Sequence, residues 1–542
     1  MFFTSSPLPS TMNSLRRPFL LLAVGCLLAV VGCTEERTTG PGVAEEPTPG
    51  SLYLEKIGGF AGGGIGAAEI VAYDPSTRRL FVVNGLLNTV DVLDLAVPSN
   101  PARVTTLNVS AFGLSANSVD VANGLVAVAV EANPKTNPGR VVFFRTDNFE
   151  VVSSVTVGAL PDMVTFTPDG RKLLVANEGE PSADYLSDPE GSISIIDVST
   201  PATPTVQTAT FSAFNGQAAS LKASGVRIYG PNATVAQDLE PEYIAVSDDG
   251  AKAWVTLQEN NAIATVDIAS ASVQNVRGLG FKNHMLPQNA LDASDKDGRV
   301  NSRNWPVFGM YQPDAVAAYT VGGESYLVTA NEGDGRDWNP GLREEARVST
   351  LNLNPAVFTD AVCGGTCKDS TRLGRLTVTR NLGLNPATNV YDSLFVLGAR
   401  SFSIWSATTG QQIWDSADQF ESRSLSYGMA AFNASHDNNT FDDRSDNKGP
   451  EPEGIAIGRI GRKTFAFIGL ERFSGIMVYD ITFPSAPRFV TYVSSREGTG
   501  GDRGPEGLTF VPARSSPTGQ PLLIVGNEIS GTTAVYRIDL LY

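Results

Sequence analysis

Short apolar runs recur along the chain, and turns separate them. Some runs alternate apolar and polar residues, as in residues 192–198 (SISIIDV), and others are apolar almost throughout, as in residues 125–130 (LVAVAV). Asp169-Gly170 and Asp249-Gly250 follow such runs, and Asp-Gly is typical of hairpin turns because glycine accepts a positive φ. The pattern predicts many short antiparallel strands and no long helix.

The strands are grouped in a repeating unit. Each unit has an acidic residue, a first run, a turn, a second run that ends in Asn or Glu, and a third run that alternates. Repeats of about 40 to 50 residues with four strands each are typical of a β-propeller. We count eight units, or seven if residues 373–414 belong to the neighbouring unit. Residues 52–60 precede the first full unit and are expected to supply the outer strand of the last one.

The fold class is therefore predicted to be all-β, a β-propeller of seven or eight four-stranded blades with loop insertions. Residues 51–542 would form this single domain. A β-helix has much shorter repeats, and separate β-sandwiches would need linkers that the sequence does not show.

The N-terminal residues have the pattern of an export signal. Arg16 and Arg17 precede an uncharged apolar run, residues 18–32, which is too short to span a bilayer. Residues 30–33 (VVGC) resemble a lipobox, in which Cys33 is lipidated, whereas the alternative at Cys26 leaves half of the apolar run attached. Residues 1–32 would be the signal, with Met12 as a possible true start, and residues 33–50 a flexible tether. We expect an exported lipoprotein that faces the periplasm or the cell surface; a plain secretory signal is the alternative.

Net charge, histidine content and cysteine content limit the binding partners and metal sites that the chain can have. The chain has 40 basic and 57 acidic residues, a net charge of −17, which disfavours nucleic acid as a partner. Only two histidines are present, so a zinc or iron site built from histidines is nearly excluded and any metal is expected to have mainly oxygen ligands. Cys363 and Cys367 are expected to form a local disulfide in an oxidising compartment, with a redox-active pair as the alternative. The mature protein is expected to be a monomer.

Acidic residues mark both ends of the first hairpin in each unit. We call the acids at the start of the first run head acids: Glu69, Asp120, Asp162, Glu242, Asp314, Glu453 and Glu506. We call the glutamates after the second run tail glutamates: Glu178, Glu332, Glu471 and Glu528. The start of a blade's first strand and the end of its antiparallel second strand lie on one face, so these acids are expected around one mouth of the channel.

So many carboxylates gathered at one mouth of the channel would repel one another unless cations neutralise them. Like charges at ~4 Å repel by ~4 kcal/mol at an effective dielectric constant of about 20. Calcium, or less favourably magnesium, is predicted on a set of metal ligands: Glu178, Glu242, Asp314, Glu332, Glu453 and Glu506. Four arginines near strand ends are the other source of positive charge: Arg336, Arg400, Arg472 and Arg503. In an architectural alternative, the head acids accept hydrogen bonds from neighbouring blades and hold the ring together.

Two insertions carry separate signals. Residues 292–298 (DASDKDG) have the clustered acids and glycine of a calcium loop without the EF-hand spacing, and the alternative is a polar turn. Residues 436–449 (HDNNTFDDRSDNKG) run into Glu451-Pro452-Glu453 and are expected to lie over the channel mouth. There they would bind a ligand or form a solvated loop.

Long motifs carry a resemblance to a known family. Residues 447–454 (NKGPEPEG), 465–472 (FAFIGLER), 175–181 (VANEGEP) and 330–338 (ANEGDGRDW) resemble the choice-of-anchor I family. The resemblance covers about residues 52–542. It implies a secreted or surface-anchored β-propeller, with Cys33 as the anchor here. Some relatives are called alkaline phosphatases and others surface glycoproteins, so no catalytic residues can be carried over.

Two functions follow. The first is a calcium-dependent, alkaline-phosphatase-like phosphoester hydrolase that acts on a phosphorylated small molecule. Its catalytic residues would be Glu453, Glu506, Arg472 and Arg503. The alternative is a non-catalytic surface module that binds a protein or a surface polymer and is held to the membrane through Cys33. A lactonase or quinoprotein-like enzyme rests on analogy of fold alone.

Overall fold

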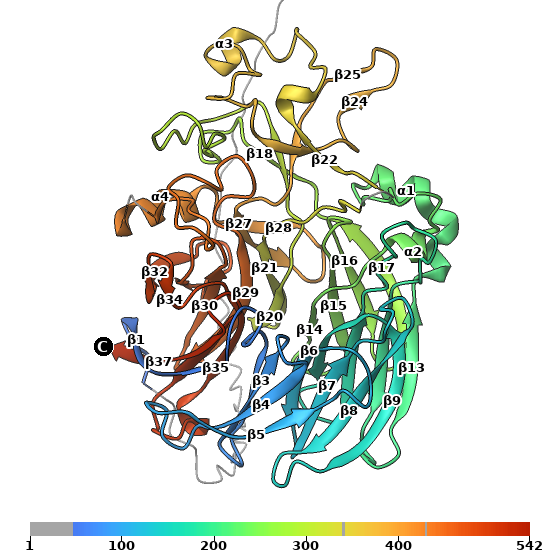
Figure 1. Cartoon of the computed structure of the whole chain (residues 1–542), viewed down its shortest axis with the longest axis vertical. Coiled ribbons are helices and arrows are strands. Elements are labelled where there is room, and N and C mark those ends of the chain that lie inside the picture. Colours follow the sequence, from blue (N-terminus) through green and yellow to red (C-terminus); the bar gives the residue numbers. More distant parts are fainter. Residues whose placement is uncertain (1–46, 339–341, 429–430) are drawn as a thin grey trace, which may run out of the picture. The chain divides into compact units, whose positions relative to one another are not determined.

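The computed structural model describes residues 47–338, 342–428 and 431–542, and in this part of the chain seven four-stranded antiparallel sheets form a β-propeller (Figure 1). The predicted signal, Cys33 and all but the end of the tether fall in residues 1–46 and lie outside the described residues. Within the described ranges, no helix has the length and apolar character needed to span a bilayer.

Each sheet is one blade, and its strands are given from the innermost outward. Blade 1 contains β2 (Val71–Asp74), β3 (Arg79–Asn84), β4 (Thr89–Asp94) and β5 (Ala102–Asn108). Blade 2 contains β6 (Ala116–Ala122), β7 (Leu125–Val130), β8 (Pro138–Arg145) and β9 (Val151–Ala159). Blade 3 contains β10 (Pro161–Phe166), β11 (Lys172–Asn177), β12 (Ser192–Asp197) and β13 (Thr205–Thr210). Blade 4 contains β14 (Ile244–Val246), β15 (Lys252–Leu257), β16 (Ala262–Asp267) and β17 (Ser272–Gly278).

The remaining blades include one long insertion and the closure of the ring. Blade 5 contains β20 (Val316–Val321), β21 (Glu324–Asn331), β27 (Ser401–Ser406) and β28 (Gln412–Asp415). Blade 6 contains β29 (Pro452–Ile460), β30 (Lys463–Leu470), β31 (Ile476–Asp480) and β32 (Arg488–Val493). Blade 7 contains β35 (Pro505–Val511), β36 (Leu522–Asn527), β37 (Thr532–Leu541) and β1 (Ser51–Ala61).

Connecting segments hold the short helices and small sheets. The helices are α1 (Ala218–Ala223), α2 (Val235–Asp238), α3 (Asp360–Cys363) and α4 (Gln419–Ser424). The 3-10 helices are η1 (Ser212–Gln217), η2 (Val348–Thr350), η3 (Leu425–Tyr427) and η5 (Ala513–Ser515). The small-sheet strands are β18 (Phe281–Asn283), β19 (Phe308–Met310), β22 (Glu345–Arg347), β23 (Thr377–Thr379), β24 (Leu384–Asn385), β25 (Val390–Tyr391), β26 (Phe395–Val396), β33 (Arg496–Glu497) and β34 (Gly500–Gly501).

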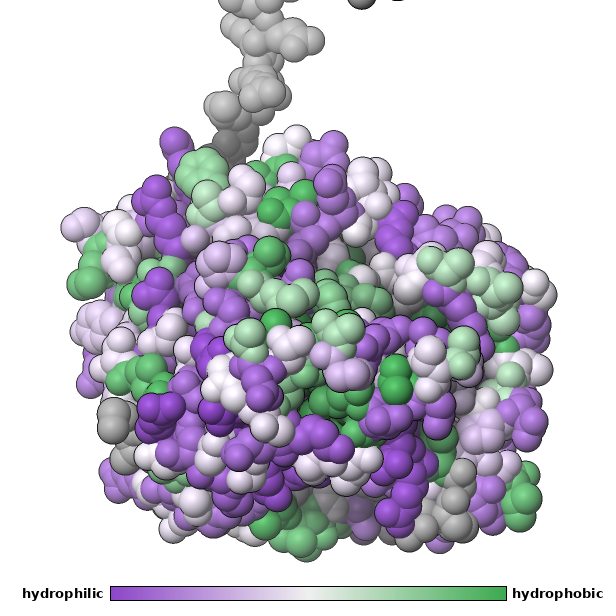
Figure 2. All heavy atoms as spheres, turned by 90° about the horizontal axis from the view of Figure 1, so that it is seen from above, coloured by the Kyte–Doolittle hydropathy of each residue, from purple (hydrophilic) through white to green (hydrophobic). Residues whose placement is uncertain are grey.

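The hydrophobic core lies between adjacent blades. Every residue of β7 is buried, because each face of this strand packs against a neighbouring blade. Val128 of β7 packs with Val92 of blade 1 on one face, and Ala127 packs with Val175 of blade 3 on the other. Strands covered on both faces are apolar throughout rather than alternating, which explains the uninterrupted second runs of the sequence. On the surface seen in Figure 2, hydrophobic residues are interspersed with hydrophilic ones.

The predicted closing strand is confirmed. β1 pairs antiparallel with β37, with Leu54 opposite Ile538, so a strand from the N-terminal side is the outer strand of blade 7. Leu52 and Leu54 are buried against blades 6 and 7, whereas Tyr53 between them is exposed. Side chains therefore alternate along this part of β1, with one face of the strand in the core and the other in solvent.

Truncating the buried face of β1 should weaken closure. Leu54→Ala is expected to lower the free energy of unfolding by about 2–5 kcal/mol, because it removes a core side chain and leaves a cavity. Tyr53→Ala, on the exposed face of the same strand, should change stability by about 0.5 kcal/mol or less. Urea unfolding of both variants checks the prediction, and equal losses would contradict it.

The structure has seven blades, so residues 373–414 do not form an eighth blade of their own. No eighth four-stranded sheet is found in the described ranges; instead β27 and β28 complete blade 5, and β26 pairs with β19. The segment between β21 and β27 folds outside the ring and shares a core with the β18–β19 insertion, to which they contribute Leu373 and Trp305 respectively. Cys363 and Cys367 form a disulfide within it, with their Cα atoms 5.2 Å apart.

Candidate functional site

Head acids and tail glutamates lie side by side at one end of the blades. In four blades the residue before the head proline has a positive φ: Leu160, Gln312, Glu451 and Gly504. Its carbonyl oxygen accepts a hydrogen bond from the tail, as in the 2.9 Å contact from the Glu178 amide to Leu160 and the 2.8 Å contact from the Glu471 amide to Glu451. A following proline disfavours the αR region for the residue before it, and the positive φ lies outside that region. This conformation turns the chain into the first strand.

All seven blades meet around a small cavity of about 80 Å³ on the propeller axis, which we call the axial cavity. Four carboxylates line it, and one amide joins them. The lining acids are Asp162, Asp314, Glu453 and Glu506, and the amide is Asn117. No lysine or arginine is among the lining residues in the part of the chain that the structure describes.

In two of these acids, one carboxylate oxygen lacks a hydrogen-bond partner among the described residues. Glu453 Oε2 and Glu506 Oε2 are shielded from solvent and have no hydrogen-bond partner. Burial raises the pKa of Glu453 well above its usual value, and the charges of Glu471 and Glu506 raise it further. Burial likewise raises the pKa of Glu506, with added repulsion from Glu69 and Glu528. Both side chains line the axial cavity and are only partly exposed, so water stabilises their charge less than it would at the surface.

The other lining acids show the same effect. Burial raises the pKa of Asp162 to about 6, and Glu131 adds to it. Burial, followed by the charge of Glu332, raises the pKa of Asp314 well above its usual value. Ionisation of all four carboxyl groups is therefore opposed in the cavity, and a bound cation would favour their charged forms.

Further acids surround the cavity. Burial raises the pKa of Glu69 to about 8, and Glu528 and Asp162 raise it further. Burial also raises the pKa values of Glu178 and Glu242, and the charge of Glu178 raises that of Glu242. The predicted metal ligands Glu178 and Glu242 therefore belong to the same charged region as the axial cavity without lining it.

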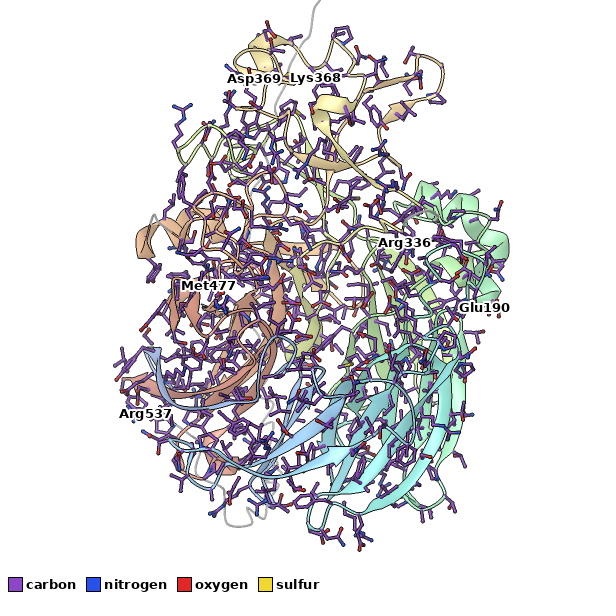
Figure 3. All side chains as sticks on the ribbon, viewed as in Figure 1. Glu190, Arg336, Lys368, Asp369, Met477 and Arg537 are labelled. Atoms are coloured by element: carbon purple, nitrogen blue, oxygen red, sulfur yellow. A yellow bond between two sulfur atoms is a disulfide. The ribbon has the colours of Figure 1, made fainter. Side chains whose placement is uncertain are left out.

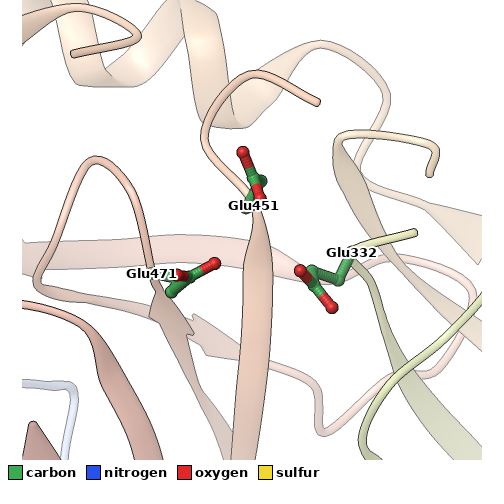
Figure 4. Close-up of side chains that lie close together, drawn as sticks. All are labelled: Glu332, Glu451 and Glu471. Carbon is green, nitrogen blue, oxygen red and sulfur yellow. The ribbon is translucent and has the colours of Figure 1, made fainter. Parts of the chain in front are cut away.

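A second acidic group, which we call the mouth cluster, consists of Glu332, Glu451 and Glu471, with one carboxylate oxygen of each within 4.8 Å of the others (Figure 4). Unlike the axial cavity, it contains its own cations. Lys448 Nζ lies 2.6 Å from Glu332 and 3.1 Å from Glu451. Arg472 Nε lies 3.2 Å from both Glu451 and Glu471.

Glu451 is the centre of this cluster. It is fully buried, and Arg444 Nη2 lies 2.7 Å from its carboxylate in addition to Lys448 and Arg472. Burial alone would raise its pKa, but the charges of Lys448, Arg444 and Arg472 hold the pKa of Glu451 well below its usual value. The protein's own side chains therefore already neutralise the mouth cluster.

Residues 436–449, the mouth loop, supply two of these cations, Arg444 and Lys448. His436 Nε2 lies 2.7 Å from Arg472 Nη1, and burial followed by the charge of Arg472 lowers the pKa of His436 to about 4. The imidazole is thus neutral at pH 7. Arg503 Nη1 donates to the carbonyl oxygen of His436 at 2.7 Å.

The four predicted catalytic residues form two pairs. Glu453 and Glu506 line the axial cavity, whereas Arg472 and Arg503 contact the mouth cluster and the mouth loop. Across the described ranges, no ion pair within 4.0 Å joins either arginine to Glu453 or Glu506.

Arg336 and Arg400 are both buried in ion pairs, and Arg400 also donates to the carbonyl oxygens of Ser445 and Asn447 in the mouth loop. Arg336, labelled in Figure 3, contacts Asp238 and Glu240, and Arg400 Nη1 lies 2.5 Å from Glu421.

Asp120 does not occupy a head position. It lies inside β6 opposite Ala127, and its Oδ2 accepts a 2.8 Å hydrogen bond from the Phe166 amide of the next blade, which is the architectural role. The head position of blade 2 is Asn117, since β6 has its register shift after Ala116 just as β10 has it after Pro161. The sequence gives one indication of the role of Asn117: it is a polar residue one position after the start of its strand.

The asparagines before the tail glutamates are structural. Asn177 and Asn331 are buried, and each donates to serines of the third strand, such as Ser194 at 3.0 Å and Ser403 at 2.8 Å. These bonds satisfy buried polar groups at the end of the blade.

Comparisons with known proteins place the chain in a family. Gigasin-3a of Magallana gigas is 30% identical over 188 residues, which cover 31% of this chain and 64% of that protein. The mesenchyme-specific cell surface glycoprotein of Strongylocentrotus purpuratus is 28% identical over 290 residues, which cover 46% of this chain and 36% of that protein. The chain thus spans less than two thirds of either relative.

Solved structures align with most of the chain at low identity. Hydrazine synthase of Kuenenia stuttgartiensis has a TM-score of 0.44 and 13% identity, covering 87% of this chain and 96% of that chain. The WD40 domain of Toxoplasma gondii coronin has a TM-score of 0.43 and 9% identity, covering 92% and 88%. The family model of the choice-of-anchor I domain matches residues 69–484, from the head acid of blade 1 to just past the third strand of blade 6. The chain belongs to the choice-of-anchor I domain family.

Proposed function

We propose that this chain is an exported, surface-held β-propeller that binds Ca²⁺ in its axial cavity and acts as a binding module. The observation that carries the cation site is the pair of shielded, partnerless oxygens, Glu453 Oε2 and Glu506 Oε2. An unpaired buried carboxylate costs several kcal/mol or takes up a proton, and a divalent cation removes that cost for several carboxylates at once.

Calcium suits the donors better than other cations. Asp162, Asp314, Glu453, Glu506 and the amide of Asn117 offer only hard donors from five different blades. Ca²⁺ accepts about 6–8 oxygen ligands in flexible geometry, whereas Mg²⁺ demands a near-ideal octahedron. Each of the five blades contributes one ligand from its own position. Such a set fits the flexible coordination of Ca²⁺ more readily than the strict octahedron of Mg²⁺.

The surface location rests on the family and on the predicted anchor. The family has a relative that is a cell surface glycoprotein, and the lipobox-like residues 30–33 would place a lipid on Cys33. Residues 34–50 would then connect the lipid to β1. We propose that this lipid holds the propeller at the membrane.

The geometry favours binding over phosphoester hydrolysis. In the hydrolase hypothesis, Arg472 and Arg503 neutralise charge at a metal held by Glu453 and Glu506. Arg472 is instead paired with Glu451 and Glu471, and Arg503 donates to the mouth loop. A ligand of the module, a protein or a surface polymer, would contact the face that carries the mouth.

Calcium binding tests the proposal. We expect Glu453→Gln/Glu506→Gln, made in residues 34–542, to bind one Ca²⁺ per chain fewer than the wild type in isothermal titration calorimetry. At a concentration of 100 times Kd, the lost site should remove about 2.7 kcal/mol of calcium-dependent stabilisation. Glu324→Gln, an exposed carboxylate on a turn of blade 5, is the matched control and should bind as the wild type does.

Two outcomes would contradict the proposal. Equal calcium stoichiometry in the double variant and the wild type would refute the axial site. Calcium-dependent turnover of phosphate mono- or diesters that Glu453→Gln abolishes would establish the hydrolase instead of the binding module.

A further inference from the structure

A hollow of about 480 Å³, which we call the basal hollow, lies at the end of blade 7 that is opposite the mouth. Thr532 at the start of β37 is opposite Ala61 and comes four residues after the tail glutamate Glu528, so it marks the mouth end of the blade. Leu541 at the other end of β37 is opposite Ser51 and lines the basal hollow. Since β37 has ten residues and a strand rises about 3.4 Å per residue, the basal hollow is about 30 Å from the mouth end.

The lining of the basal hollow exposes three large side chains: Tyr53 at 44%, Leu541 at 50% and Tyr542 at 76%. Tyr53 is opposite Asp539, two residues before Leu541, so Tyr53 and Leu541 are diagonal neighbours on one face of the sheet. Among the described lining residues, Asp539 is the one charged side chain, and Arg537 Nε pairs with it at 2.7 Å. The basal hollow is therefore a nearly uncharged exposed patch on a protein whose net charge is −17.

The N-terminal segment enters the domain at the same place. Pro47, the first described residue, lines the basal hollow. Directly after it, Thr48 Oγ1 accepts the Arg462 amide of blade 6 at 3.0 Å, which fixes the entry point. Cys33 comes fourteen residues before Pro47, and a chain of that length spans at most about 50 Å in any conformation. A lipid on Cys33 would therefore keep the basal hollow within about 50 Å of the bilayer.

We propose that the basal hollow, with Tyr53, Leu541 and Tyr542, is a docking surface for the lipid bilayer. The inference rests on the proposed anchor at Cys33, because the anchor is what brings this surface to the membrane. Once the chain is tethered, docking is intramolecular, so a patch too small to bind a membrane from solution is occupied. Tyrosine rings are amphipathic and suit the headgroup level, whereas leucine suits the boundary of the acyl chains.

Charge favours this end of the propeller over the mouth end. The mouth end carries the head acids and the tail glutamates, and burying such charges against a bilayer is costly. The basal hollow presents a single charged side chain, Asp539, which is already paired. Docking through the basal hollow would hold the mouth on the side away from the membrane, where a ligand of the binding module can reach it.

A vesicle assay tests the surface whether or not Cys33 carries a lipid. Residues 34–542 would be made with an N-terminal hexahistidine and held on phosphatidylcholine vesicles by a nickel-chelating lipid, which takes the place of the anchor. This segment contains two cysteines, Cys363 and Cys367, and they are joined in a disulfide. An environment-sensitive fluorophore can therefore be attached to a single introduced cysteine.

Leu541→Cys places the fluorophore at the basal hollow, and Leu86→Cys is the matched control. Leu86 is 53% exposed and lies in the turn after the second strand of blade 1, at the mouth end. On tethering, emission from the label at position 541 should shift to shorter wavelength and be quenched by nitroxide-labelled lipids. The label at position 86 should show neither change. Adding Tyr53→Ser and Tyr542→Ser should remove most of the shift at position 541 while the protein stays tethered.

The proposal is overturned if the label at position 541 does not respond to tethering, if the label at position 86 responds as strongly, or if the two serine substitutions leave the shift intact. It is also overturned if the shift appears without vesicles and grows with protein concentration, since a second copy would then cover the surface. If Leu541→Cys does not fold, Tyr542→Cys carries the fluorophore and Tyr53→Ser is the substitution.

The anchor is tested separately from the docking surface. Cys33→Ala in the full chain should move the protein from the membrane fraction to the soluble fraction. Retention in the membrane fraction would refute the anchor, and the vesicle assay would still report on the basal hollow, because the chelating lipid replaces Cys33 there.

Discussion

Glu451→Gln is expected to destabilise the protein by about 3 kcal/mol at pH 7. The substitution keeps the shape of the side chain but leaves Lys448, Arg444 and Arg472 without their shared buried anion. Removing one partner of a buried ion pair costs about 3–5 kcal/mol. The lower end applies because Lys448 retains Glu332 and Arg472 retains Glu471. Urea unfolding measures the change.

The effect should depend on pH with a definite sign. The pKa of Glu451 is held below its usual value in the folded state, so its stabilisation is present above the unfolded pKa of about 4.3 and is lost as the pH falls toward the folded pKa. The difference between the wild type and Glu451→Gln should therefore shrink below about pH 4. Glu453→Gln, two residues away, is the control. Glu453 has no cationic partner, so in EDTA this variant should lose no stability. Equal losses for the two variants would contradict the assignment.

Arg336→Met should destabilise the protein by about 3–5 kcal/mol, because it removes a buried cation from its acidic partners. Arg336 Nε donates to Glu240 at 3.0 Å, its Nη1 contacts Asp238, and its guanidinium carbon lies 4.7 Å from the centre of the Tyr229 ring. Arg336, Asp238 and Glu240 are all buried, so losing the cation leaves two unpaired acids in the interior. Thermal and urea unfolding report the loss.

A compensating variant separates charge from packing. Arg336→Met/Asp238→Asn/Glu240→Gln removes the stranded acids and should recover more than half of the lost stability. Arg299→Met removes an arginine that is 71% exposed, and it should change stability by about 0.5 kcal/mol or less. If the triple variant is no more stable than Arg336→Met, the loss comes from packing against Tyr229 and not from the buried charges.

The sequence predicted the fold well because propeller blades are local. In every blade except blade 5, the first hairpin, its turn and the third strand lie within about 40 residues, so the apolar pattern and the Asp-Gly turns suffice to find them. The number of blades remained open at seven or eight because blade 5 is interrupted. β21 ends at Asn331 and its partner β27 begins at Ser401, and no local pattern shows that two such distant runs pair.

The candidate site was predictable only in part. The placement of head acids and tail glutamates follows from strand direction, but which acids reach the axis depends on register. Asp120 and Asn117 differ by three residues in β6, and only the register shift after Ala116 puts Asn117 in the cavity. The partners of the arginines could not be predicted, because Arg336 and Arg400 pair with acids that are distant in the sequence, Glu240 and Glu421.

The pairing of β1 with β37 has a consequence for biogenesis. A ribosome makes residues 51–61 long before residues 532–541, so blade 7 cannot assemble while the chain is being synthesised. Until then β1 has no partner, and a ring of six blades exposes strand edges and apolar faces that invite aggregation. Closure between the two ends would thus delay completion of the ring until the last strand of the chain has been made.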